Sequence, residues 1–311
     1  MRNTSYYIVT GIVLAQGRTI GATKLLPKTV GKLSLWYSGK PDYLCYFALP
    51  ICIFALIMSD SASLNTVHHP KISIIIVTLN VAGDLQNCLD SVYRQQYPAI
   101  EIVIMDGGST DGTVDILKAN DAKIACWKSE KDGGIYEAMN KALDFITGDW
   151  VYFLGADDVL FDDFSTLGYQ LKNNSLIYYG SVLMDGKKFR GETTAYQHSK
   201  SAICHQAIIY PKRVFEKYRF NTKYRISADH ELNMRAWKDE DFTFFYVDLV
   251  IAKFNHTGVS SLSIDEDLER DKSMVILKNH GFLNWARYKF RMLKGMLFPK
   301  KRKSMPQVKR S

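Results

Sequence analysis

The stretch Trp150-Val151-Tyr152-Phe153-Leu154-Gly155-Ala156-Asp157-Asp158 decides the fold of this chain. Five apolar or aromatic residues lead directly into two adjacent carboxylates, which is typical of a buried strand that ends in a cleft. In open α/β sheets, ligands bind outside the carboxyl ends of the strands. Paired carboxylates there suit a hard divalent cation, which takes oxygen ligands and often shares them with substrate phosphates. By itself, the pair is more often an acidic loop after a strand, so the rest of the chain must decide.

Residues 71–158 alternate β-branched runs of strand length with segments whose apolar residues recur at helical spacing. This alternation predicts an α/β fold with a mostly parallel sheet and helices on both faces. The residues after 158 are less regular, but they still predict two strands and a helix with Ser227 as its cap. The expected strands are 72–77, 100–105, 124–127, 150–154, 176–184 and 242–250, and the expected helices begin after Asp84 and cover 113–118, 135–146 and 227–237.

The net charge of +8 is concentrated at one end of the chain. Residues 282–311 contain ten basic residues and no acidic residue, which leaves the other 281 residues at about −2. Because the charge belongs to a tail and not to a face of the fold, we expect no nucleic-acid partner. The five cysteines show no metal-site spacing, which favours reduced thiols in a protein that faces the cytosol.

The first 70 residues predict a separate N-terminal extension. Within it, residues 43–58 form an uncharged run, interrupted by Pro50, that as a helix would span about 24 Å against ~30 Å for the hydrocarbon core. The run is consistent with a short membrane anchor, an interfacial helix or a buried hairpin. Basic residues before it would keep that side cytoplasmic and export everything that follows. That would separate the later residues from cytosolic nucleotides, so we favour an association that does not cross the membrane, with a true span as the alternative.

Residues 263–311 predict a basic, helical C-terminal tail. Six of its apolar residues can share one helical face, with Arg287, Arg291 and Lys294 elsewhere on the helix. A basic amphipathic helix with aromatic residues is typical of a membrane-surface segment, and the alternative is a solvated tail. The six apolar residues are Phe282, Trp285, Ala286, Phe290, Leu293 and Leu297.

Two glycine-rich turns each lead into a predicted helix. The first, Asp106-Gly107-Gly108-Ser109-Thr110-Asp111-Gly112, puts a carboxylate at a strand end, where it can accept hydrogen bonds from a base or ribose, or cap the helix. It is neither a dinucleotide fingerprint nor a phosphate loop. The second, Asp132-Gly133-Gly134-Ile135-Tyr136, presents helix N-terminal amides that attract phosphate. Asn140 and Lys141 lie further along that helix, where they can reach a ligand.

Taken in order, these segments resemble the family 2 glycosyltransferases. The resemblance begins at Thr78-Leu79-Asn80, includes both glycine-rich turns and the acidic pair, and continues through Cys204-His205-Gln206, 226–232 and 258–261. It covers roughly residues 71–262, and the order of several segments is more specific than any one of them. The resemblance implies the GT-A fold of the nucleotide-diphospho-sugar transferases for residues 71–262.

The resemblance also implies roles for individual residues. Many relatives carry Asp where this chain has Gly155, so metal and ribose binding would depend on fewer carboxylates. Asp229 matches the catalytic base, although an Asp in a first helical turn is also favoured by the helix dipole alone. The implied donor contacts are Thr78, Asn80, Asp106, Asp132, Asn140 and Asp157; the implied ligands of a divalent metal, Mg²⁺ or Mn²⁺, are Asp157 and Asp158; and His205 and Gln206 are expected near the acceptor or the diphosphate.

These observations predict an inverting, metal-dependent glycosyltransferase that uses a nucleotide-diphospho sugar. The expected acceptor is lipid-linked or a saccharide, in bacterial surface polysaccharide assembly. The expected location is the cytoplasmic face of the inner membrane, with peripheral or N-terminal anchoring. A sugar nucleotidyltransferase of similar fold is one alternative, but it would need a glycine-rich loop with Arg and Lys that residues 77–84 lack. A non-catalytic nucleotide- or membrane-binding protein is the other.

Overall fold

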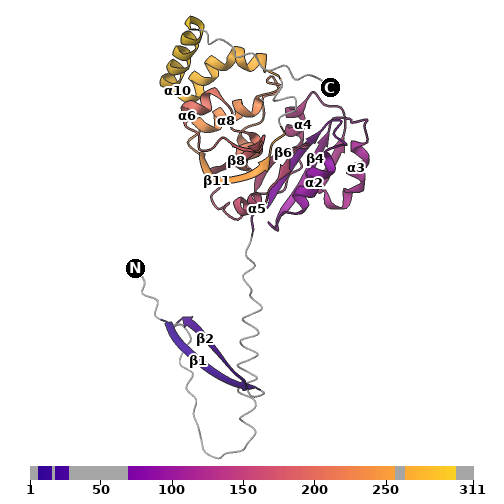
Figure 1. Ribbon diagram of the computed structural model, residues 1–311, viewed down its shortest axis with the longest axis vertical. Helices are drawn as coiled ribbons and strands as arrows, with labels where there is room; N and C mark the ends of the chain where they lie inside the picture. Colours follow the sequence, from indigo (N-terminus) through magenta and orange to yellow (C-terminus); the bar gives the residue numbers. More distant parts are fainter. Residues whose placement is uncertain (1–5, 16–17, 28–68, 256–262, 299–311) are drawn as a thin grey trace, which may run out of the picture. The chain divides into compact units, whose positions relative to one another are not determined.

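The computed structural model describes residues 6–15, 18–27, 69–255 and 263–298 (Figure 1). The chain divides into two units, Met1–Thr66 and Val67–Ser311. In the first unit, β1 (Tyr6–Ala15) and β2 (Arg18–Pro27) pair as an antiparallel hairpin, which the residue pattern did not lead us to expect. The apolar run 43–58 lies outside the described residues, so its association with a membrane stays a prediction.

The second unit is built on one sheet of nine strands. They are β3 (Ile72–Thr78), β4 (Ile100–Asp106), β5 (Cys126–Ser129), β6 (Trp150–Gly155), β7 (Val159–Leu160), β8 (Leu176–Met184), β9 (Lys187–Phe189), β10 (Ile208–Pro211) and β11 (Thr243–Lys253). Their order is β5-β4-β3-β6-β10-β8-β11-β7, with β9 paired to β8. The strands from β5 to β6 are parallel, as predicted, whereas β10 runs antiparallel to both of its neighbours and makes the second half mixed.

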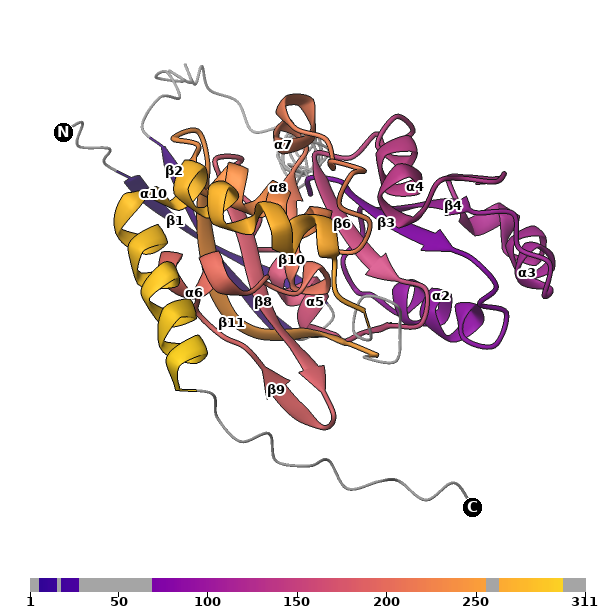
Figure 2. The ribbon, with the colours of Figure 1, turned by 90° about the horizontal axis from the view of Figure 1, so that it is seen from above.

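Helices cover the sheet on both sides. Figure 2 shows α4 and α2 on opposite sides of β3, and six of the seven residues of β3 are buried. The helices are α2 (Leu85–Tyr93), α3 (Thr113–Ala119), α4 (Ile135–Ala142), α5 (Asp163–Gly168), α6 (Ala195–Lys200), α7 (Arg213–Lys217), α8 (Ala228–Lys238) and α10 (Glu266–Leu297), with single 3₁₀ turns at Asp121–Lys123 and His205–Ala207.

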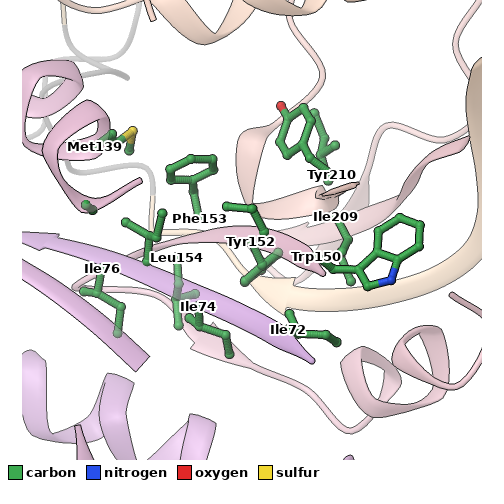
Figure 3. Packing of buried hydrophobic residues seen from close by; sticks show 14 of the residues in the cluster. Ile72, Ile74, Ile76, Met139, Trp150, Tyr152, Phe153, Leu154, Ile209 and Tyr210 are labelled. Carbon is green, nitrogen blue, oxygen red and sulfur yellow. The ribbon is translucent and has the colours of Figure 1, made fainter. Parts of the chain in front are cut away.

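The strand that leads into the acidic pair is held by apolar contacts on both faces (Figure 3). Tyr152 lies beside Ile74 in the register of β6 and β3, within the layer that the β-branched run of β3 predicts. On the other face, the Phe153 ring makes edge contacts with Phe215 and Phe220. Burying each such side chain contributes about 1.5–3 kcal/mol to stability. The end of β6, and the carboxylates after it, are therefore placed by a rigid core.

Two predicted caps make no capping bond, and two predicted boundaries were wrong. Asp84 stands at the N-cap of α2, but its side chain accepts no capping hydrogen bond, and neither does that of Ser227 before α8. The third strand begins at Cys126 instead of Ile124, because pairing with β4 determines its position, not the apolar run. The helix expected to reach residue 146 ends at Ala142, where the chain turns toward β6.

The tail contains α10, which follows β11 in the chain and packs against α8 and α6. Within the described ranges, no helix combines the length and the apolar character needed to cross a membrane.

Candidate active site

The carboxyl ends of β3, β4 and β6 meet at one edge of the sheet. Thr78 pairs with Asp106 in the register of β3 and β4, and Val77 pairs with Gly155 in that of β3 and β6. The chain adds β4 and β5 on one side of β3 and β6 on the other, so this edge is the topological switch point where open α/β sheets bind ligands. The three predicted polar segments are therefore brought together by strand order.

Asp106 is saturated with hydrogen bonds from its own loop and from the ends of β3 and β5. Its carboxylate accepts from the Thr78 hydroxyl (2.9 Å), the Gly108 amide (3.1 Å), the Ser109 amide (2.9 Å) and the Ser129 hydroxyl (2.6 Å), and also from the Ser109 hydroxyl. Burial tends to raise its pKa, but these donors outweigh burial and lower the pKa overall. A carboxylate offers about four lone-pair sites. Donor binding by Thr78 and Asp106 stays a prediction. To bind the donor, Asp106 would have to give up one of these hydrogen bonds for a bond to the donor.

Asn80 joins the two loops beyond the strands. Its φ of 52° is left-handed, its amide donates to the Ser109 hydroxyl (2.8 Å), and its side-chain oxygen accepts from the Thr110 amide (2.9 Å). Leu79 beside it leaves 58% of its surface exposed at this edge, which places an apolar surface where the predicted nucleoside would lie. The resemblance did not assign Leu79 a role, because an isolated exposed leucine carries no signal in sequence.

The second glycine-rich turn begins α4 with a local network. Asp132 accepts from the Gly134 amide (2.9 Å), and Gly134 has a φ of 129° that favours glycine. Asn140 uses both ends of its side-chain amide on the backbone of Phe220, donating at 2.9 Å and accepting at 3.0 Å. Asn140 thus ties α4 to the loop before α8, and a donor contact would cost it these bonds. Asp132 lies beside the loop that follows β4, because its Oδ2 is 3.2 Å from the position that a Cβ on Gly107 would take.

Asp158 is as deeply buried as Asp106 at this edge, with 1% of its surface exposed. One oxygen accepts from Gln206 Nε2 and the other from the Asn255 amide, each at 2.7 Å. Burial and the charge of Asp157 raise its pKa to about 6, and burial likewise raises the pKa of Asp157. A Cβ at Gly155 would lie 2.3 Å from Asp158 Oδ2. Asp158 therefore occupies the space that a third carboxylate at Gly155 would need.

The residues present fit an open divalent-metal site. Among the described residues, no three His, Cys, Asp or Glu side chains cluster closely enough to hold a metal by themselves. Two adjacent carboxylates with raised pKa values nevertheless leave negative charge that a cation would neutralise. Gln206 Oε1 is buried and has no hydrogen-bond partner within the described residues, which adds a third oxygen beside Asp158. Magnesium-type sites take one or two carboxylates and complete their ligands with water and substrate phosphates.

Asp229, in the first turn of α8, is buried but ionised. The Tyr136 hydroxyl lies 2.9 Å from its Oδ1, and His205 Nδ1 lies 3.7 Å from its Oδ2. Burial tends to raise the pKa of Asp229, but the contact with His205, followed by that with Tyr136, lowers it overall. Burial and the nearby Asp229 charge raise the pKa of Tyr136, which keeps its hydroxyl a proton donor. Tyr136 comes from α4, so it links the second glycine-rich turn to the predicted base.

A cavity of about 220 Å³ lies against Asp229, and His205 and Gln206 also line it. Arg190 lines the same cavity and was not predicted, since no motif marks the irregular chain after β9. Its φ of 60° is left-handed, its guanidinium donates to the Ser201 hydroxyl, and its Nε is buried without a hydrogen-bond partner in the described part of the chain. The cavity thus combines an ionised carboxylate, a histidine and a cation.

Comparison with known proteins agrees with this geometry. Residues 73–239 match the sequence profile described as glycosyl transferase family 2. A PGL/p-HBAD biosynthesis glycosyltransferase of Mycobacterium tuberculosis is 37% identical over 210 residues, which cover 64% of this chain and 82% of the relative. An uncharacterized glycosyltransferase of the same species is 31% identical over 206 residues, 62% of this chain and 78% of the relative.

Solved structures show the same fold. The crystal structure of Staphylococcus aureus TarS residues 1–349 in complex with UDP superposes with a TM-score of 0.57 at 18% identity, covering 74% of this chain and 72% of that one. The same protein in complex with UDP-GlcNAc superposes with a TM-score of 0.54 at 19% identity, covering 74% and 76%. The predicted GT-A fold is thereby confirmed, whereas the bounds 71–262 stay a prediction, and neither alternative function is favoured.

Proposed function

The chain belongs to glycosyl transferase family 2, and from that premise we propose that it is an inverting hexosyltransferase. It moves a sugar from a nucleotide-diphospho donor to an acceptor hydroxyl. The observation that carries this proposal is Asp229, with its lowered pKa, on the wall of a cavity that Gln206 also lines, because Gln206 donates a hydrogen bond to Asp158. The displacement requires a base for the acceptor hydroxyl and a group that binds the leaving diphosphate.

The donor is placed at the strand edge. The loops after β3 and β4 hold the nucleoside, with Asn80, Asp106 and the exposed Leu79 forming its platform. Asp157 holds the ribose, and the amides that begin α4 attract the diphosphate. Complexes of the structural neighbour TarS with UDP and UDP-GlcNAc support a nucleotide sugar as the donor class. Assays with a panel of nucleotide sugars would identify the nucleoside and the sugar of the donor.

Asp158 and Asp157, with Gln206 Oε1, would hold the divalent metal. When bound, the metal supplies Lewis-acid stabilisation for the negative charge that develops on the leaving diphosphate. Without the positive charge of a metal, the pKa of Asp158 is raised to about 6. Ionising both buried carboxylates together is therefore unfavourable, and a bound cation would make it more favourable. The Gln206 amide nitrogen donates to Asp158, and its oxygen is buried without a hydrogen-bond partner among the described residues.

Asp229 is the general base. Its Oδ1 is occupied by the Tyr136 hydroxyl, which leaves Oδ2 to face His205 and the cavity. As the acceptor oxygen attacks C1 of the donor sugar, its proton passes to Oδ2, and the bond from C1 to the diphosphate oxygen breaks. The new bond forms on the face opposite the leaving group, so the configuration at C1 inverts. A positioned base of this kind contributes ~10²–10⁴-fold.

The acceptor lies over Asp229 and carries an anionic group. Arg190 supports this, because its guanidinium lines the cavity and its Nε is unpaired within the described residues. A lipid-linked saccharide, with its phosphate, meets that requirement better than a neutral polysaccharide. We place the enzyme at the cytoplasmic membrane face, in surface polysaccharide assembly, where the donor is available and the acceptor is anchored.

The proposal is tested with a panel of UDP-, GDP- and dTDP-sugars, each assayed for nucleoside-diphosphate release with Mg²⁺, with Mn²⁺ and with a chelator. We expect one donor class to be turned over, only with metal, and faster when a lipid-linked acceptor is added. Product NMR then reports the anomeric configuration, which should be opposite to that of the donor. Release of inorganic diphosphate from a sugar phosphate and a nucleoside triphosphate would instead identify a nucleotidyltransferase.

A further inference from the structure

Helix α10 changes character at Gly281. The backbone there is not helical (φ 77°, ψ 172°), and Figure 2 shows the last stretch of the helix turning away from the stretch before it. Before the kink, Leu268, Ile276 and Asn279 are buried, and this stretch packs against α8 and α6. After the kink, large apolar side chains become exposed. Residues 282–298 therefore form a separate segment whose apolar surface needs an explanation.

Five of the eight exposed large apolar residues in 282–298 form one stripe, whereas Met292 and Met296 lie outside it and Phe298 follows the end of α10. At 100° per residue, the five residues of the stripe fall within a single arc of about 100°. Trp285, which the sequence pattern placed on the same face, lies outside this arc, and its ring nitrogen donates to the Ser273 hydroxyl (3.0 Å). The stripe and its exposed fractions are Phe282 65%, Leu283 77%, Phe290 69%, Leu293 54% and Leu297 64%. An apolar row of this size in water is typical of an interaction site.

Basic residues border the stripe. Residues 282–298 contain four Lys or Arg and no acidic residue. Where this segment passes α6, two cations lie over the Tyr196 ring, with Lys200 Nζ at 4.2 Å and Arg287 Cζ at 4.0 Å from its centroid. Burial and the charges of Arg291 and Arg287 lower the pKa of Lys200. Three cations are thus held close together beside an apolar stripe, an arrangement that an anionic partner would relieve.

We propose that residues 282–298 lie in the plane of an anionic membrane surface, with the stripe among the acyl chains and Lys200, Arg287 and Arg291 on lipid phosphates. This inference deepens the membrane location proposed above and rests on it. Charge complementarity selects the partner: a second copy docked through the same stripe would bring like-charged borders together, whereas anionic lipid matches both features.

The position of α6 gives this surface a functional consequence. Lys200 ends α6, and the next residue, Ser201, lines the cavity that contains Asp229. Ser201 also accepts the hydrogen bond from Arg190. A membrane bound at Lys200 therefore lies one residue from the acceptor cavity. A lipid-borne acceptor can reach Asp229 from such a surface without leaving the bilayer.

The test uses the full chain, because residues 43–58 provide another way of reaching a membrane. A photoreactive benzoyl-phenylalanine replaces Phe290, and the matched control places it at Phe245 on β11, which is 46% exposed. Both proteins are irradiated with vesicles of phosphatidylcholine containing 30% phosphatidylglycerol. We expect crosslinks to lipid from position 290 and none from position 245. Vesicle-bound protein without lipid crosslinks at 290 would overturn the proposal, and so would crosslinks from 290 to a second protein chain.

The charge contribution is tested by the triple variant Lys200→Gln, Arg287→Gln, Arg291→Gln. Because each basic residue near an anionic surface strengthens binding several-fold, the yield of lipid crosslinks at 290 should fall roughly tenfold or more. The control, Lys118→Gln, Lys123→Gln, Lys128→Gln, removes the same charge near α3 and should leave the yield unchanged. Equal losses of crosslink yield in both variants would mean that binding depends on the net charge of the protein and not on this surface. Thermal melts check that both fold. Lipid crosslinking does not depend on sugar transfer, so a failed donor panel and a failed membrane surface are separate results.

Discussion

Asp158 and Asp229 are two buried carboxylates with opposite pKa shifts. Asp158 is buried beside Asp157, and its pKa is raised to about 6. Asp229 is buried beside His205 and the Tyr136 hydroxyl, and its pKa is lowered. Burial raises both pKa values, so the neighbours decide the outcome. The difference teaches that the surroundings of Asp158 lack positive charge, whereas the neighbours of Asp229 already stabilise its carboxylate.

This difference matches two chemical roles. A site that needs a cation suits a metal and a diphosphate, and an ionised carboxylate on a cavity wall suits a base. The two regions are connected by the segment 204–206, because His205 contacts Asp229 and Gln206 donates to Asp158. Four predictions test whether the roles divide in this way.

The largest effect is expected for Asp229→Asn. Removing the base should slow the chemical step ~10²–10⁴-fold, while donor affinity stays near normal, because the donor contacts lie at the strand edge. Single-turnover rates and donor titrations measure the two quantities separately. Asp115→Asn, on the exposed side of α3, is the matched control. Lost donor affinity with fast single-turnover chemistry would make Asp229 a binding residue, and Asp158 and Asp229 would then not differ in role.

A smaller loss of ~10²–10³-fold is expected for Asp158→Asn, typical of losing one electrostatic contribution to a developing charge. Asp157→Asn should lose less, because Asp157 is less buried and accepts fewer hydrogen bonds from the protein. The loss should appear as weaker dependence on Mn²⁺ and not as unfolding, which circular dichroism checks. Full activity of Asp158→Asn, or undiminished wild-type activity in excess chelator, would refute the metal assignment.

A change of about tenfold is expected in metal affinity between pH 7.5 and pH 5. The raised pKa of Asp158, about 6, means that its carboxylate is protonated as the pH falls below 6, and metal binding needs the ionised form. Calorimetry with Mn²⁺ at both pH values measures this change. Asp229→Asn should show the same pH dependence, since its carboxylate lies outside the metal site. Equal affinities at the two pH values would place the metal elsewhere.

The smallest effect is expected for Tyr136→Phe. The variant keeps the ring packed against Phe220 and removes only the hydroxyl that helps hold the pKa of Asp229 low. The pKa of Asp229 should therefore rise, and the acidic limb of the kcat–pH profile should move to higher pH, with a loss of roughly fivefold near that limb. Tyr97→Phe, which loses a hydroxyl bonded to Pro70 far from the site, is the control. If the acidic limb of the kcat–pH profile did not move, Tyr136 would contribute packing against Phe220 and no control of the pKa of Asp229.

The residue pattern predicted the parallel half of the sheet well and the rest less completely. β3 and β6 are long, buried and β-branched or aromatic, so local pattern and burial agree. The short strands β7, β9 and β10 and the short helices α5 to α7 were missed, because two to six residues carry too little periodicity. β10 joins the sheet through pairing with β6 and β8, and such partners are not visible in a local window.

The candidate site divides in the same way. Sequence alone determined which carboxylates stand at strand ends and helix starts, because strand polarity and helix capping are local properties of the chain. Only the tertiary structure decided what each carboxylate does. Asp106 is saturated by its own loop and by the ends of β3 and β5, Asp158 is left short of positive charge, and Asp229 is held ionised by a hydroxyl and a histidine from distant segments. Arg190 and Tyr136 entered the site for the same reason. A pKa depends on which groups lie within a few ångströms, and that is a property of packing.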